Sequence, residues 1–137
     1  MIASDGEAFV GADASGELGS VVLCGLGGIH VEALGQVDGR LVPVSEDDAL
    51  DLVGSLDRVG VFTGSRGAEP WDRHALSGVV RSVSAIASST RDWLLSLDIN
   101  PLMRTSAGFV AVDAVVFVAQ ARAARSRNET SERAAGK

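Results

Sequence analysis

The sequence predicts an α+β fold in which short strands, some paired as hairpins, pack with two helices. Two longer segments repeat apolar residues at helical spacing, whereas several short apolar runs end at Gly, Pro, Asp or Ser, as strands do. The strand-like runs precede and follow the helices without regular alternation. This favours a mixed or antiparallel sheet over a doubly wound parallel one. A chain of 137 residues with 46% hydrophobic residues is most simply one domain with a sizeable core.

Charge and cysteine content limit the classes of function. The formal charge of −6 argues against general nucleic-acid binding, which needs a basic surface to replace counterions. It leaves room for a nucleotide, because a bound Mg²⁺ and a few backbone N–H groups can hold phosphates on an acidic protein. Cys24 is the only cysteine, so no internal disulfide can form and a reducing compartment is expected.

Nothing in the sequence indicates export or a membrane span. No run of about 18 apolar residues is present, so we expect no membrane-spanning helix and no membrane partner. The first five residues lack the basic region and apolar core of a signal peptide. The expected location is the cytoplasm.

The first part of the chain resembles strands separated by turns. The segment at 13–17 is turn-like, and the apolar run after it is apolar on both faces, as in a central strand. Pro43 indicates a strand end or a sheet edge. Four strands are expected in this part, at 8–10, 21–24, 29–34 and 40–44.

Two helices follow. Ser45 is a suitable N-cap for the first, and three acidic residues at 46–48 occupy its first turn, where the helix dipole favours negative charge. Ala49, Leu52, Val53 and Leu56 give this helix one buried face. The second helix is expected over about 71–89, and a strand at 93–97 follows it.

The segment Leu97-Asp98-Ile99-Asn100-Pro101-Leu102 is the first candidate site. Asp98 and Asn100 are two residues apart, so an extended backbone directs both side chains to one face. Pro101 has no N–H and is expected to end or turn the strand. A second apolar run ends at Asp113, and a hairpin between the two runs would gather three oxygen ligands of the kind that Mg²⁺ prefers. The alternative is a hairpin with ordinary polar turn residues.

The glycine-rich segment Gly25-Leu26-Gly27-Gly28 is the second candidate. It follows a strand, but no helix pattern follows it, so it is neither a dinucleotide fingerprint nor a P-loop. Gly25, Gly27 and Gly28 could let backbone N–H groups approach a phosphate or acyl group. The segment could equally form a tight turn between strands, and the motif alone favours the turn.

Three further residues are weaker candidates. Glu32 is either a ligand for a metal or nucleotide or a residue on a solvated strand face. Arg66 lies in a loop rich in glycine and is a better phosphate partner than Arg40. His30 is expected to be structural, because no serine or cysteine is placed near it as a nucleophile.

Four segments together resemble a known family. They are 25–32, 40–50, 64–67 and the pair 97–102 with 111–114, in this order. From about residue 7 to residue 117 the chain resembles the ATP-grasp domain of NDP-forming acyl-CoA synthetases. These are the ADP-forming acetyl-CoA synthetases, related to the β subunit of succinyl-CoA synthetase.

The resemblance implies a fold and an activity. Residues 1–118 would form the C-terminal lobe of an ATP-grasp domain. Residues 119–137 lie outside the resemblance; their Ala/Arg-rich and then polar composition predicts a short helix at 119–127 and a flexible polar tail after it. Enzymes of this family interconvert acyl-CoA, ADP and phosphate with a carboxylic acid, CoA and ATP, and a phosphoryl group passes through a histidine on another domain. ATP or ADP and Mg²⁺ are therefore the implied cofactors.

The resemblance also assigns roles to single residues. Asn100 and Asp113 match positions that ligate Mg²⁺, and Asp98 matches the acidic position of the same motif. Glu32 and the glycine segment match residues near the nucleotide phosphates, and His30 does not match the phosphohistidine.

Several departures from the family limit what the chain is expected to do. The match lacks the N-terminal lobe with its phosphate-binding lysine, and the CoA-binding and ligase domains. Ser15, Leu18, Gln36 and Gly39 also replace residues usual in the family. We therefore expect the missing parts on another chain, and little activity from this one alone. The alternatives are a non-catalytic interaction module or subunit, and a part of a fused protein acetyltransferase.

Overall fold

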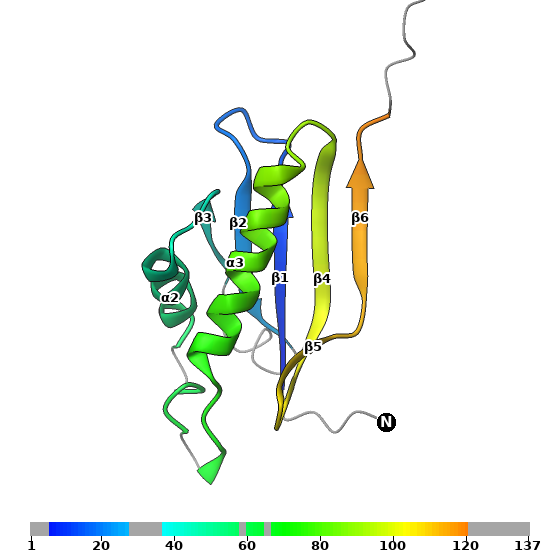
Figure 1. Ribbon diagram of the computed structural model, residues 1–137. Helices are drawn as coiled ribbons and strands as arrows, with labels where there is room; N and C mark the ends of the chain where they lie inside the picture. The colour runs from blue at the N-terminus through cyan, green and yellow to red at the C-terminus, as the bar shows by residue number, and fades with distance from the viewer. Residues whose placement is uncertain (1–5, 28–36, 58–59, 65–66, 121–137) are drawn as a thin grey trace, which may run out of the picture.

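In the part of the chain that the structure describes, one antiparallel sheet of six strands carries two helices on one of its faces (Figure 1). The computed structural model describes residues 6–27, 37–57, 60–64 and 67–120. In sequence order the elements are β1 (Glu7–Asp13), β2 (Val21–Leu26), β3 (Val37–Leu41), α2 (Glu46–Ser55), α3 (Arg73–Ser89), β4 (Leu94–Thr105), β5 (Gly108–Ala111) and β6 (Ala114–Val118). The strand order is β3-β2-β1-β4, and both β5 and β6 pair with β4.

The predicted α+β class is confirmed, and the described strand pairs are all antiparallel. Ser45 caps α2 as expected: its Oγ accepts from the Asp48 N–H at 3.1 Å, and Asp48 Oδ2 accepts from the Ser45 N–H at 3.2 Å. α3 begins two residues later than expected because Asp72 caps it by accepting from the Ala75 N–H at 2.9 Å.

The core lies between the sheet and the helices. α3 packs across β1 and β2, and α2 packs against α3 and β3. Trp71, just before α3, meets the rings of Phe62 and Phe109 edge-on, with ring centroids 6.3 and 5.8 Å apart. The buried hydrophobic residues are Ala8, Val10, Ala12, Val22, Cys24, Leu26, Ala49, Leu52, Val53, Leu56, Trp71, Leu76, Val80, Val83, Ala87, Leu94, Leu97 and Leu102.

The opposite face of the sheet is not covered by any helix of the described chain. We call it the open face. Because side chains alternate along a strand, it carries the residues between the buried ones. Its central positions include Phe9, Gly11, Leu23 and Asp98.

β4 runs unbroken through Pro101, so the prediction that the strand ends or turns there is wrong. The register between β1 and β4 shifts at this point, and both Asn100 and Pro101 oppose Phe9 alone. Such a β-bulge is one of the few places where a sheet tolerates proline, because the bulged residue needs no ladder N–H. On its other side β4 changes partner at the same residues, pairing with β6 over 94–99 and with β5 over 102–105.

Some expectations fall outside the described residues. They include the strand at 29–34 and most of the short helix at 119–127. The predicted division at residue 118 stays a prediction. Neither described helix is both long and apolar enough to cross a membrane.

Replacing a leucine of the core tests the packing directly. Leu52 on α2 is fully buried, whereas Leu41 at the end of β3 is 58% exposed. Leu52→Ala is expected to lower the free energy of unfolding by about 2–5 kcal/mol, because it removes buried methyl groups and leaves a cavity. Leu41→Ala is the matched control and should change it by about 0.5 kcal/mol or less. Urea unfolding measures both, and equal losses would contradict the assigned core.

The thiol of Cys24 provides a second test. Cys24 is fully buried on the helix-covered face of β2, and this burial raises the pKa of the thiol to about 12. We expect a thiol reagent such as DTNB to leave the native chain unmodified at about pH 8, where an ordinary thiol reacts. Full labelling should follow in denaturant. Rapid stoichiometric labelling of the native protein would contradict this placement.

Candidate functional site

Asp98 lies at the centre of the open face. Across four neighbouring strands, the Cα partners form one row: Leu23 of β2, Gly11 of β1, Asp98 of β4 and Val115 of β6. Paired residues of adjacent strands share a face, so this row runs across the open side of the sheet. Asp98 therefore lies between β1 and β6 on the open face, and it is exposed.

The bulge in β4 places Asn100 beside Asp113. Ile99 packs against the core, so Asn100, the next residue, faces the open side and is exposed. The Asn100 N–H donates to the Asp113 carbonyl oxygen at 3.1 Å, which fixes the link between β5 and β6 next to the bulge. The structure thus places the backbones of Asn100 and Asp113 side by side, two residues along β4 from Asp98. That the three side chains act together as ligands stays a prediction.

The oxygen atoms of Asp98, Asn100 and Asp113 are suitable ligands for a hard cation such as Mg²⁺, provided that another group supplies the remaining oxygens. Both oxygens of Asp98 and the amide of Asn100 make no hydrogen bond with another described side chain, whereas Asp113 Oδ1 accepts from the Ala114 N–H at 2.9 Å. Within the described part of the chain, no three His, Cys, Asp or Glu residues converge as a metal site. The candidate set is therefore two carboxylates and one amide, too few to complete an octahedral Mg²⁺ shell without further oxygens.

The glycine segment borders the same face. Gly25 pairs with Phe9 on the open face, and the Gly27 N–H donates to the Glu7 carbonyl oxygen at 2.7 Å. A Cβ at Gly27 would lie only 3.0 Å from the Glu7 Cβ, so a side chain at Gly27 would crowd the start of β1. Gly28, Glu32 and Arg66 lie outside the described residues, and their assignments stay predictions.

Gly11 was not among the sequence-predicted residues, although it lies directly beside Asp98. A Cβ at this position would be 2.7 Å from the Leu97 carbonyl oxygen and 3.6 Å from Asp98 Oδ1. A glycine inside the apolar run of β1 is the signal that could have identified it, because glycine in a strand often marks a close approach. It keeps the surface next to Asp98 flat.

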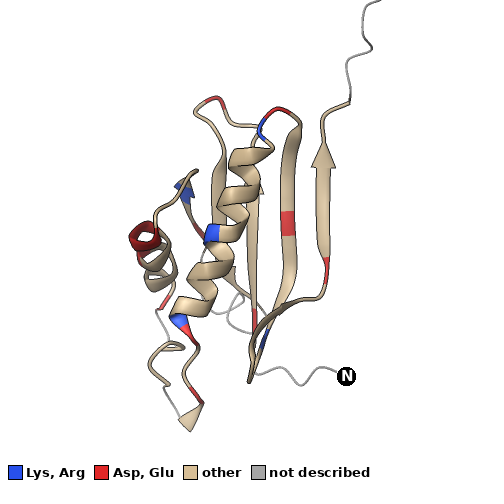
Figure 2. Ribbon diagram, viewed as in Figure 1, with Lys and Arg blue, Asp and Glu red and all other residues tan. Residues whose placement is uncertain are grey.

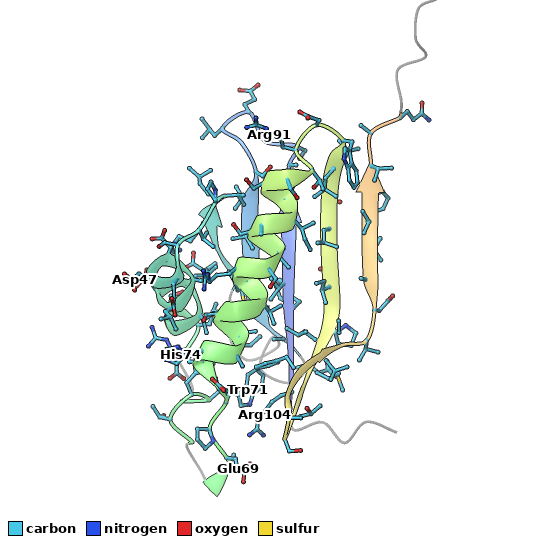
Figure 3. The ribbon with its side chains drawn as sticks, viewed as in Figure 1. Asp47, Glu69, Trp71, His74, Arg91 and Arg104 are labelled. Carbon is cyan, nitrogen blue, oxygen red and sulfur yellow. The ribbon has the colours of Figure 1, made fainter. Side chains whose placement is uncertain are left out.

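A surface cavity of about 340 Å³ lies elsewhere, between the β4–β5 turn and the start of α3. Arg104 lines it with a side chain only 10% exposed, and its guanidinium lies 3.5 Å from Glu69 and donates to the Pro70 carbonyl at 3.3 Å (Figure 3). These contacts hold the segment before α3 to β4. Asp98, Asn100 and Asp113 do not line this cavity, so it is distinct from the site that these described residues form.

Comparison with known proteins assigns the family. Residues 1–118 match the sequence model of an ATP-grasp domain. The chain belongs to the ATP-grasp domain family. The suspected resemblance is thereby confirmed, and the open-faced antiparallel sheet is the ATP-grasp lobe that it implied.

Several relatives of this ATP-grasp chain are similar over most of its length. The β subunit of ADP-forming acetate–CoA ligase II from Pyrococcus furiosus is 31% identical over 120 residues, which are 86% of this chain and 51% of the relative. A dinucleotide-forming acetyl-CoA synthetase 1 from Ca. Korarchaeum cryptofilum, solved with coenzyme A, acetyl-CoA and a phosphorylated phosphohistidine segment, superposes with a TM-score of 0.78 at 28% identity. That superposition covers 87% of this chain and 53% of the other.

Another structure of the same Korarchaeum synthetase is a complex with coenzyme A and Mg-AMPPCP, with its phosphohistidine segment pointing towards the nucleotide-binding site. It superposes with a TM-score of 0.74 at 29% identity over 83% of this chain and 53% of the other. The chain spans about half the length of the relatives it matches.

Two glycine substitutions test the close approach at Gly11. Gly11→Ala should lower the free energy of unfolding by about 1–3 kcal/mol, because the new methyl group would press on the backbone of β4. Gly78→Ala is the matched control: Gly78 is exposed on α3 with open space around it, so alanine should raise stability by about 0.5–1 kcal/mol. Thermal or urea unfolding measures both. Stabilisation by Gly11→Ala would contradict the described contact.

Proposed function

We propose that the open face forms one wall of a Mg²⁺–nucleotide site in an ADP-forming acyl-CoA ligase. In this reaction acyl-CoA, ADP and phosphate interconvert with a carboxylic acid, CoA and ATP. The observation that carries the proposal is the bulge in β4, which gathers Asp98, Asn100 and Asp113 on an exposed, helix-free face. Support comes from the relatives, which are named as ligases of this class, and from the related synthetase solved with Mg-AMPPCP.

The chemistry of the donors favours a cation together with phosphates. Asp98 and Asp113 make this region negative, so they would repel a bare polyphosphate. A Mg²⁺ held by Asn100 and Asp113, with Asp98 beside them, would reverse that repulsion. When bound, it would neutralise charge on the transferred phosphoryl group, which is where phosphoryl transfer gains most.

The surrounding residues would position the nucleotide. Gly11, whose backbone is buried, adds no side chain beside Asp98, and Gly25 and Gly27 continue this run of positions without side chains toward the start of β1. Gly28 and Glu32 continue this segment, and we propose that they lie near the phosphates. Arg66 is proposed as a cationic partner of a phosphate.

The remaining parts of the reaction are proposed to come from a partner. The chain spans about half the length of the Pyrococcus β subunit and of the Korarchaeum synthetase chain, and the latter was solved with a phosphohistidine segment pointing towards its nucleotide-binding site. We therefore propose that an N-terminal ATP-grasp lobe and CoA-binding and ligase domains act with this chain. The chain alone should bind Mg–ATP weakly and should not form ATP from acyl-CoA, ADP and phosphate.

Thermal unfolding with and without ligand tests the site. Saturating Mg–ATP should raise the unfolding midpoint by a few degrees, because a ligand at ten times its Kd contributes about 1.4 kcal/mol. The double variant Asn100→Ala/Asp113→Ala should lose this shift. Asp92→Ala, which removes an exposed carboxylate just before β4, is the control and should keep it. An unchanged shift in the double variant would contradict the assignment of the ligands.

The incomplete donor set gives a separate prediction. Because the described residues supply only three side-chain ligands, cation and nucleotide should bind together. Mg²⁺ alone and ATP with EDTA should each leave the unfolding midpoint almost unchanged, while the two combined raise it. Tight binding of Mg²⁺ alone by isothermal titration would contradict this arrangement.

A further inference from the structure

β6 forms an open edge of the sheet. It lies at the outer side of the sheet beside β4, which is its only partner among the described strands (Figure 1). α3 packs on β1 and β2 and does not extend over β6. Each residue of β6 is exposed, so both faces of this strand and its outer edge are accessible.

The hydrogen bonds of the flanking residues show which backbone groups point outward. The Asp113 carbonyl accepts from the Asn100 N–H, and the Ala119 N–H donates to the Trp93 carbonyl at 2.8 Å, so residues 113 and 119 face β4. Backbone groups alternate along a strand, so 115 and 117 also face β4. Ala114, Val116 and Val118 therefore direct their N–H and C=O groups away from the sheet.

The side chains of β6 lack the usual protection of an exposed edge. The strand reads Ala-Val-Val-Phe-Val, without a charge or a proline (Figure 2). Val116 is 51% exposed and Phe117 is 62% exposed. Natural edge strands are usually guarded by charges, proline or covering elements, so a bare apolar edge indicates a strand-pairing surface.

At the other edge of the sheet, β3 is protected by charged side chains and by α2. In β3, Arg40 forms ion pairs with Asp38 at 3.1 Å and with Asp51 of α2 at 2.8 Å. Ser55 of α2 also donates to Asp38 at 2.8 Å, and this hydrogen bond lowers the pKa of that carboxyl. The helix and the charges together protect β3, whereas β6 contains no charged residue and neither described helix packs on it.

We propose that β6 pairs with β6 of a second copy of this chain, in antiparallel orientation around a two-fold axis at Val116. The outward-facing residues are symmetric about Val116, so Ala114 would pair with Val118 of the second copy and Val116 with its counterpart. Val115 would then face Phe117 across the interface, a β-branched and aromatic pair of the favourable kind. The sequence of β6 is thus complementary to itself in the register that its free backbone groups require.

The interface would be small. A strand of five residues buries well below the roughly 800 Å² per partner of a standard stable interface. We therefore expect a weak dimer that forms as the concentration rises. This proposal does not rest on the nucleotide site and can fail or succeed independently of it.

Sedimentation velocity over a concentration series, about 10 μM to 1 mM, tests the dimer. Val116→Lys places two like charges at the two-fold axis and should weaken association by roughly a hundredfold. Val37→Lys is the matched control, because Val37 is 52% exposed on the guarded edge strand β3, and it should dimerise as the wild type does. Mixing Val116→Lys with Val116→Glu should restore dimers through opposite charges. A monomeric wild type, or equal loss in both lysine variants, would overturn the proposal.

Hydrogen exchange of the wild-type chain gives a readout that needs no variant. Raising the concentration should slow exchange at the outward amides of Val116 and Val118. The amides of Val115 and Phe117, which already face β4, should be unaffected. Concentration-independent exchange at Val116 and Val118 would also overturn the proposal.

Discussion

The bulge at Asn100 and Pro101 is the constraint on which the rest of the structure depends. At these two residues β4 shifts its register against β1 and passes from β6 to β5 on its other side. The hydrogen bond from Asn100 to the Asp113 carbonyl holds the β5–β6 link against this point. One irregularity therefore fixes the path of three strands, and it also presents the three candidate ligands.

The two faces of the sheet differ in what covers them and in the side chains they carry. The helix-covered face carries the alternating apolar residues of β1, β2 and β4 and supplies the core. The open face carries the carboxylate of Asp98 and, beside it, Gly11 without a side chain, and we propose that a ligand covers it. This division would let the same strands stabilise the fold and carry the proposed site.

Much of this arrangement followed from the sequence. The helical spacing and the Ser45 cap predicted α2, and the positions of Asp98, Asn100 and Asp113 predicted a shared face. The sequence could not predict that Pro101 lies within β4. Local propensity indicates a strand end at proline, whereas the register shift against β1, a tertiary feature, accommodates it within β4. Gly11 was missed for a similar reason, since its closeness to Asp98 depends on which strand pairs with β1.

The most direct test of the central claim uses Mn²⁺ in place of Mg²⁺, since its unpaired electrons broaden the NMR signals of nearby amides. With ATP and substoichiometric Mn²⁺, a proton–nitrogen correlation spectrum of the labelled chain should lose the amide signals of Asp98, Asn100 and Asp113 first. Gly11 should follow, while amides of α2 stay sharp. Uniform weak broadening, or broadening centred on the cavity beside Arg104, would contradict the account.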